Sequence, residues 1–193
     1  TIWTPANVDP VYNIPSTILR CMPTAKYLIL EMGVEFPGEM DFYLWLARPQ
    51  IGVITNIYQT HTQFFGNIDG VVEEKGKLVE QLGKKGFAVL NKNSTYLQKL
   101  AKNTKAHIVW FGKDSLIRAE KTEIAGDFKT RFTLHIGKEN TEVTLPLLGT
   151  QFAENALAAA AIGFACGAGI KEIKTGLENF NAPEHRMRPL KLK

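Results

Sequence analysis

The sequence predicts an α/β protein with a mostly parallel sheet flanked by helices and a small antiparallel β annex. Two observations predict this fold class. Over residues 1–112, short apolar runs typical of strands alternate with segments whose apolar residues recur at helical spacing. Such alternation is typical of a parallel sheet with right-handed crossovers. Over residues 113–146, three strand-like runs are separated by turn residues, which is typical of antiparallel pairing.

The first region is expected to contain five strands and four helices in alternation. The strands are expected at residues 2–4, 27–31, 51–55, 87–90 and 107–111. The helices are expected at residues 15–21, 38–47, 69–82 and 94–101. In the second of these helices, Met40, Tyr43 and Leu44 recur at helical spacing. Arg48-Pro49 ends it, because a residue before proline disfavours helical angles.

The second region adds the antiparallel annex and two closing helices. The annex strands are expected at residues 115–124, 129–136 and 141–145, with turns at Gly126-Asp127 and at residues 137–140. The helices are expected at residues 151–166 and 170–180. Alanine in the first of them permits close packing against the sheet. The polar and basic tail, residues 183–193, is interpreted as a linker or as the start of a following domain.

Composition indicates a globular protein of ordinary charge. The chain has 193 residues, 45% of them hydrophobic and 22% charged, with a formal charge of +4. No long basic run with interleaved aromatics occurs, so a nucleic-acid partner is not predicted; an anionic small ligand suits the same charge. The printed residues show no signal-peptide pattern and no apolar stretch long enough to cross a bilayer. We therefore expect a cytoplasmic protein without a membrane span.

Polar residues follow two predicted strands at the points where they end. Glu31 closes the run 27–31, Thr55 and Asn56 follow the next run, and His61 lies five residues further on. Side chains at the carboxyl ends of neighbouring parallel strands converge on one crevice, where ligands bind. A carboxylate is a hard oxygen ligand suited to Mg²⁺. The pattern therefore predicts a metal-assisted phosphate site. Alternatively, Glu31 is a surface carboxylate that bonds a neighbouring loop, and His61 is solvated. Asn56 could hold a phosphate, a ribose or its own turn.

Lys75 lies within a charge run, residues 73–77, on the predicted helix 69–82. Such a run is normally a solvated helix face with i,i+3 or i,i+4 pairing. Gly76 costs about 1 kcal/mol relative to alanine in a helix, which suggests a close neighbour there. Lys75 could contact a phosphate or, as a carbamate, ligate a metal. No G-x-x-x-x-G-K-[ST] phosphate loop occurs, and residues 83–86 form a helix-to-strand turn of the wrong geometry.

Seven segments occur in an order that resembles the Mur ligase family, the ATP-dependent amide-forming enzymes of peptidoglycan assembly. They are Glu31-Met32-Gly33 with Gly38-Glu39, Ala47 to Ile57, His61 with Phe65-Gly66, Lys75-Gly76, Gly86 to Asn91, Asn155 to Ala159, and Gly176-Leu177 to Phe180 with Arg186-Met187. Glu-Met-Gly favours the member of the family that adds D-alanyl-D-alanine. The resemblance spans nearly all of the chain.

The resemblance implies a metal centre that acts in catalysis. Glu31 and His61 would help bind Mg²⁺. Lys75 matches a lysine that is carbamylated in several family members, where it supports a second metal. On this reading Lys75 and His61 are catalytic residues, and Glu31, His61 and carbamylated Lys75 are metal ligands.

The resemblance also implies a nucleotide site and two substrates. Asn155 matches an asparagine near the adenine, Thr55 and Asn56 would line the nucleotide side of the crevice, and Asn7 would lie near the nucleotide-sugar and the phosphates. The cofactors would be ATP and Mg²⁺. A carboxylate of a UDP-N-acetylmuramoyl-peptide would attack the γ-phosphate, and D-alanyl-D-alanine would displace phosphate from the resulting acyl phosphate.

The chain departs from the family pattern in three places. Asp9-Pro10 stands where the family has Asn-Asn, and Gln151-Phe152 stands where it commonly has His-Asn. The phosphate loop of the family would precede Thr1. Residues 1–182 are therefore interpreted as a central ATP-binding domain without its phosphate loop, inactive alone and open to self-association at a sheet edge. The alternative is a degenerate, non-catalytic binding or scaffold domain.

Overall fold

The structure is a computed structural model that describes residues 1–5, 8–126 and 128–181. Asn7, the turn residue Asp127 and the tail 183–193 lie outside the described residues. The predictions made for them are therefore not tested. In the described part, the strands form two sheets, one of six strands in the order β3-β4-β5-β6-β7-β8 and one of two strands, β1-β2.

The elements alternate as predicted, and most bounds differ from the prediction by a few residues. The strands are β1 Ile2–Trp3, β2 Leu28–Ile29, β3 Ile51–Ile54, β4 Phe87–Asn91, β5 His107–Phe111, β6 Ile117–Ala125, β7 Lys129–Ile136 and β8 Glu139–Leu145. The helices are α1 Pro10–Leu19, α2 Glu39–Leu46, α3 Thr62–Phe65, α4 Ile68–Glu80, α5 Thr95–Leu100, α6 Gln151–Ala165 and α7 Ile170–Glu178. The predicted α/β fold class, with its antiparallel annex β6–β8, is confirmed.

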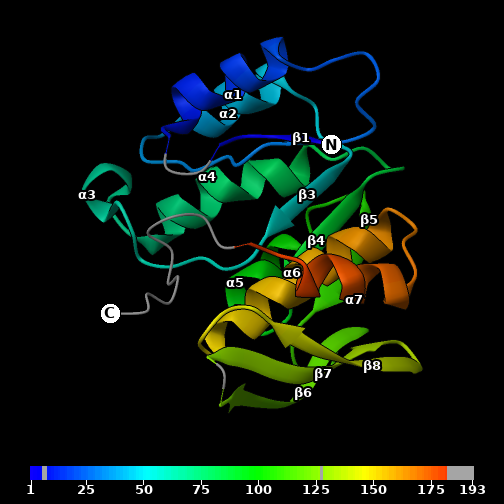
Figure 1. Ribbon diagram of the computed structural model, residues 1–193. Coiled ribbons are helices and arrows are strands. Elements are labelled where there is room, and N and C mark those ends of the chain that lie inside the picture. Colours follow the sequence, from blue (N-terminus) through cyan, green and yellow to red (C-terminus); the bar gives the residue numbers. More distant parts are fainter. Residues whose placement is uncertain (6–7, 127, 182–193) are drawn as a thin grey trace, which may run out of the picture.

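Helices cover both faces of the six-stranded sheet. Ala88 and Leu90 of β4 are buried in a core with α1, α2, α4 and α5, whereas Val89 is buried in a second core with α6. Successive side chains of a strand point to opposite faces, so these two cores lie on opposite sides of β4. Figure 1 shows α4 between the α1–α2 layer and β3, and shows the annex at the other end of the molecule.

The expectation of one parallel sheet joining the strands near Glu31 and Thr55 is wrong. β2 pairs in parallel with β1, and β3 is an edge strand of the other sheet. The sequence pattern identifies strands but does not encode which strands are neighbours. β2 is also shorter than expected, so Glu31 lies two residues beyond its end. Self-association through a free strand edge stays a prediction.

Two helices near the site differ from expectation. α1 begins at Pro10 rather than at Pro15, because the Asp9 carboxylate accepts a hydrogen bond from the Val11 N–H at 2.9 Å and caps the helix. Pro10 then occupies the first helical position, where its missing N–H costs nothing. The short helix α3, which follows His61 directly, was not predicted.

The close approach expected at Gly76 is confirmed. A β-carbon on Gly76 would lie 2.7 Å from Cδ2 of Leu100, a buried side chain of α5. The neighbour is therefore the core side chain that packs α5 on α4, and not a ligand. The absence of a side chain at Gly76 therefore lets these two helices meet.

Substituting Gly70 with alanine is expected to lower the free energy of unfolding by about 2 kcal/mol, the usual cost of overpacking. A β-carbon on Gly70 would lie 2.4 Å from the backbone carbonyl oxygen of Phe65, so α3 must move away from α4. Urea unfolding measures the loss. The matched control is Gly176→Ala in α7, where the new methyl meets nothing within 4 Å. Alanine there should stabilise by up to about 1 kcal/mol. A Gly70→Ala protein as stable as the wild type would contradict the packing.

Candidate metal and nucleotide site

Glu31 lies on a backbone that is fixed by the two-stranded sheet. Its N–H donates to Oγ1 of Thr4 at 2.9 Å, and Thr4 is a buried residue that directly follows β1. The side chain itself is exposed. Across the described ranges, its carboxylate makes no hydrogen bond or ion pair within the protein. The backbone is thus held in place while the carboxylate is left free to bind a cation.

His61 is the residue that precedes helix α3, and its backbone is left-handed, with φ of 55°. Its side chain is exposed. A non-glycine residue in this region is uncommon and is usually retained for a turn or for a function. Here the conformation turns the chain from the loop after β3 into α3.

The Asn56 amide is used within its own loop. Its Oδ1 accepts from the Ile57 N–H at 2.9 Å, and its Nδ2 donates to the Tyr58 hydroxyl at 2.9 Å. Of the three alternatives for this residue, the structure shows the one in which the side chain holds its own turn. Thr55 is exposed directly after β3. Contact of Thr55 or Asn56 with a nucleotide stays a prediction.

Lys75 and Glu74 are neighbours on α4 with different surroundings. Lys75 is half-buried, and its burial lowers the pKa of the ammonium group below the usual 10.5. A lowered pKa increases the share of neutral amine, which is the form that adds carbon dioxide to give a carbamate. Glu74 is buried, with 3% of the residue exposed. The interpretation of the whole charge run as a solvated face is therefore wrong for Glu74.

Three segments that carry Glu31, His61 and Lys75 converge. The Phe36 ring, in the loop after Glu31, contacts the Phe64 ring of α3 with centroids 4.3 Å apart. Helix α3 packs on α4, which carries Lys75. Glu74 of α4 in turn accepts a hydrogen bond from the Gly38 N–H, at the end of the loop that begins at Glu31. Each of the three segments thus contacts both of the others.

This convergence arises differently from the prediction. Ring contact and helix packing produce it, and adjacency of two strands in one sheet does not. In the part of the chain that the structure describes, no three His, Cys, Asp or Glu side chains form a metal-binding group. A metal centre here would need a third donor of another kind, and carbamylated Lys75 fits that need chemically. The metal and catalytic roles stay predictions.

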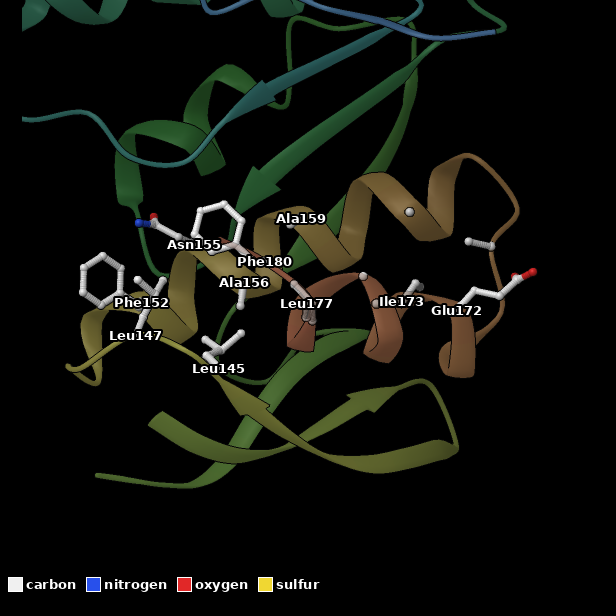
Figure 2. Close-up of a pocket in the computed structure, with 13 residues that line it drawn as sticks. Leu145, Leu147, Phe152, Asn155, Ala156, Ala159, Glu172, Ile173, Leu177 and Phe180 are labelled. Atoms are coloured by element: carbon white, nitrogen blue, oxygen red, sulfur yellow. The ribbon is translucent and has the colours of Figure 1, made fainter. Parts of the chain in front are cut away.

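A second candidate region is an apolar pocket of about 620 Å³ between α6, α7 and the end of β8. Figure 2 shows Phe152, Asn155 and Phe180 at one end of it and Glu172 at the other. Asn155 thus offers an amide beside two aromatic rings. Flat apolar surface with one hydrogen-bonding group is suited to a nucleobase. The sequence predicts a role near the adenine for Asn155 but none for Phe180, which comes close only because α7 folds back along α6.

Replacing Lys75 with methionine is expected to raise stability at pH 7, and the gain should shrink as the pH rises toward 10.5. The folded-state pKa of Lys75 is lowered, so the buried charge destabilises the fold below that pKa. Deprotonation removes this cost at high pH. Urea unfolding of both proteins in CO₂-free buffer at pH 7 and pH 10 measures the difference, with Lys99→Met on α5 as control. A pH-independent difference would contradict the assigned burial.

Comparison with known proteins identifies the class. Residues 1–163 match the Mur ligase middle domain, and the chain belongs to the Mur ligase family. It is similar to UDP-N-acetylmuramoyl-tripeptide–D-alanyl-D-alanine ligase of Escherichia coli K12, with 30% identity over 100% of this chain and 43% of that protein. The same ligase of Buchnera aphidicola subsp. Baizongia pistaciae is 33% identical over 100% of this chain and 42% of its own length.

Solved structures show the same fold. MurF from Acinetobacter baumannii superposes with a TM-score of 0.92 at 24% identity, over 99% of this chain and 42% of that one. MurF ligase from Thermotoga maritima in complex with ADP gives 0.82 at 20% identity, over 96% and 43%. The chain therefore spans about two fifths of the length of these relatives. No helix in the described ranges is both long and apolar enough to cross a membrane.

Proposed function

We propose that the full-length protein containing this chain is an ATP-dependent ligase of peptidoglycan precursor synthesis. It would add D-alanyl-D-alanine to UDP-N-acetylmuramoyl-tripeptide in the cytoplasm, where ATP is available. The chain would supply the central ATP-binding domain. The observation that carries the proposal is the convergence of the Glu31, His61 and Lys75 segments in a member of the Mur ligase family.

Three side chains fit a Mg²⁺ site in this proposal. Glu31 offers a free carboxylate on a fixed backbone, His61 offers an imidazole at the turn into α3, and carbamylated Lys75 offers a second anionic group. Oxygen and imidazole donors of this kind bind divalent cations. Bound Mg²⁺ would neutralise charge on the phosphoryl oxygens as the substrate carboxylate attacks ATP.

The pocket at α6 would receive the base of the nucleotide. Asn155 would hydrogen-bond the base edge, and Phe152 would present its ring to the base face. Stacking of a base on an aromatic side chain is worth about 1–3 kcal/mol. Phe152 would thereby replace the contact made by the asparagine that the family commonly has at this position. Thr55 and Asn56 would lie toward the phosphates.

The test is a ligation assay of the full-length protein with ATP, Mg²⁺, UDP-N-acetylmuramoyl-tripeptide and D-alanyl-D-alanine. We expect ADP and phosphate in equal amounts, together with the amide product identified by mass spectrometry. Omitting D-alanyl-D-alanine should abolish the amide. Product formation with a single amino acid, and none with the dipeptide, would overturn the proposed substrate while keeping the reaction class.

A non-catalytic binding module is the second candidate function. It is favoured by Phe152 and Gln151, which remove the usual His-Asn pair, and by Asp9, whose carboxylate is used to cap α1. In that case the full-length protein would bind ATP without consuming it. Calorimetric ATP binding combined with no phosphate release in the complete assay would decide for this alternative.

A further inference from the structure

Helix α4 carries a buried carboxylate that bonds to another helix. The Glu74 side chain is only 4% exposed. Its Oε1 accepts from the Gly38 N–H at 3.0 Å and from the Met40 N–H at 2.8 Å, both at the start of α2. Its Oε2 accepts from Lys77 Nζ at 2.8 Å, and the same Nζ bonds to Asp41 of α2 at 2.6 Å. Both carboxylate oxygens are therefore used to hold α4 against the start of α2.

The start of α2 in turn fixes the loop that begins at Glu31. Oε2 of Glu39 accepts from the Glu35 N–H at 2.6 Å and from the Phe36 N–H at 3.0 Å, which folds the loop back on the helix. Phe36 contacts Phe64 of α3, next to His61. The Glu74 carboxylate is thus bonded to the start of α2, which fixes the loop that carries Glu31. The same loop touches α3, the helix that follows His61.

The free backbone N–H groups at the start of a helix can be capped locally, by a side chain of the residue before the helix. That position in α2 is Gly38, which has φ of 92° and no side chain to offer. The acceptor comes instead from α4, from the residue directly before Lys75. Any rotation or sliding of α4 would withdraw a buried charge from its donors, which is strongly unfavourable. Glu74 therefore fixes the rotation and the axial position of α4 relative to the loop that begins at Glu31.

We propose that Glu74 is a positioning residue that sets Lys75 relative to Glu31 and His61, so that the three can bind one divalent-cation centre. This inference rests on the proposed function for the identity of the three ligands. Glu74 itself touches neither substrate nor metal in this arrangement. Its role is to transmit the position of α4 to the loop through the Gly38 and Met40 N–H groups.

The test uses the full-length protein and Mn²⁺ as the probe, with bound Mn²⁺ measured by electron paramagnetic resonance. Glu74→Ala should weaken Mn²⁺ binding about tenfold or more, the usual effect of losing a group that orients metal ligands. Glu74→Gln keeps an oxygen acceptor for Gly38 and Met40 and should retain most of the affinity. Leu78→Ala is the matched control, because it truncates a buried side chain of α4 that packs on Gly52 of β3 and leaves the α2 contact intact.

Amide hydrogen exchange supplies the structural readout. Faster exchange at Gly38 and Met40 is expected in Glu74→Ala and not in Leu78→Ala. If Glu74→Ala does not fold, Glu74→Asp serves, since it keeps the charge but is one methylene short of the two N–H groups. Mn²⁺ affinity in the Glu74 variant within twofold of that of Leu78→Ala would overturn the inference, as would a wild type that binds no Mn²⁺. Weakened Mn²⁺ binding in a protein that does not ligate would support the positioning role and reject the ligase assignment.

Discussion

Replacing Lys75 with alanine in the full-length protein is expected to lower the rate of ATP-dependent ligation by about 100-fold, the upper range for losing a group that tunes a metal site. Lys75 is half-buried on α4 with a lowered pKa, and its Nζ is the candidate for carbamylation. The alanine variant removes the third donor, a second anionic group, that the proposed centre needs beside Glu31 and His61. Steady-state phosphate release, measured at several Mg²⁺ concentrations, gives the effect.

The control for this prediction separates the carbamate from the lysine itself. Wild-type activity should fall in CO₂-free buffer and return when bicarbonate is added, because the carbamate forms reversibly from the neutral amine. Lys75→Ala should not respond to bicarbonate. Lys84→Ala, on the exposed turn before β4, should behave as the wild type. More than a tenth of wild-type activity in Lys75→Ala would remove Lys75 from the reaction.

Replacing Thr130 with valine is expected to lower the free energy of unfolding by about 3 kcal/mol. Thr130 of β7 is fully buried. Its Oγ1 donates to the Leu147 carbonyl at 2.7 Å, with a longer contact to the Gly149 carbonyl at 3.1 Å, and it accepts from the Gly149 N–H at 3.0 Å. Valine keeps the shape and leaves these buried groups unpaired, which costs about 1–3 kcal/mol for each. Urea unfolding measures the loss.

Thr133→Val on the same strand is the matched control for the Thr130 prediction. Thr133 is half-buried, and its hydroxyl makes no hydrogen bond to any described residue. Its replacement should change stability by less than about 0.5 kcal/mol, as for most surface substitutions. Because residues 147–149 lead into α6, Thr130→Val should also loosen the helix that presents Asn155. Equal effects of the two valine substitutions would show that the Thr130 hydroxyl contributes nothing.

The local pattern of the sequence is sufficient to predict much of the fold. The bounds of β5 and β7 agree with the prediction to the residue, because each is an apolar or alternating run between clear turn residues. The start of α1 was missed although its signal is present. Asp9-Pro10 is a good helix start, with a capping carboxylate followed by proline at the first position. The comparison with the family pattern marks that pair only as a departure, and so it hides the helix start.

The sequence predicts which residues belong to the candidate site. It does not predict the contacts that bring them together. Glu31, His61 and Lys75 were identified, but the contact that joins their segments depends on Phe36 and Phe64, which no periodicity distinguishes. Glu74 could not be told from its solvated neighbour Glu73, because burial of one member of a charge run depends on what packs against the helix. The glycine before α2 signals that an acceptor is needed there, but not which distant side chain supplies it.

The antiparallel annex meets the parallel strands at one register pair, Phe111 of β5 with Ile117 of β6, while α6 packs on β3, β4, β5, β6 and β7. If a pulling force were applied between these two halves, the strand pairing that resists it would be limited to this one register pair. The packing of α6 on both halves would then bear most of the force. When the annex is pulled away from β4 in an optical trap, α6 should detach first. The unfolding force should therefore depend on the packing of α6 rather than on the pairing of β5 with β6.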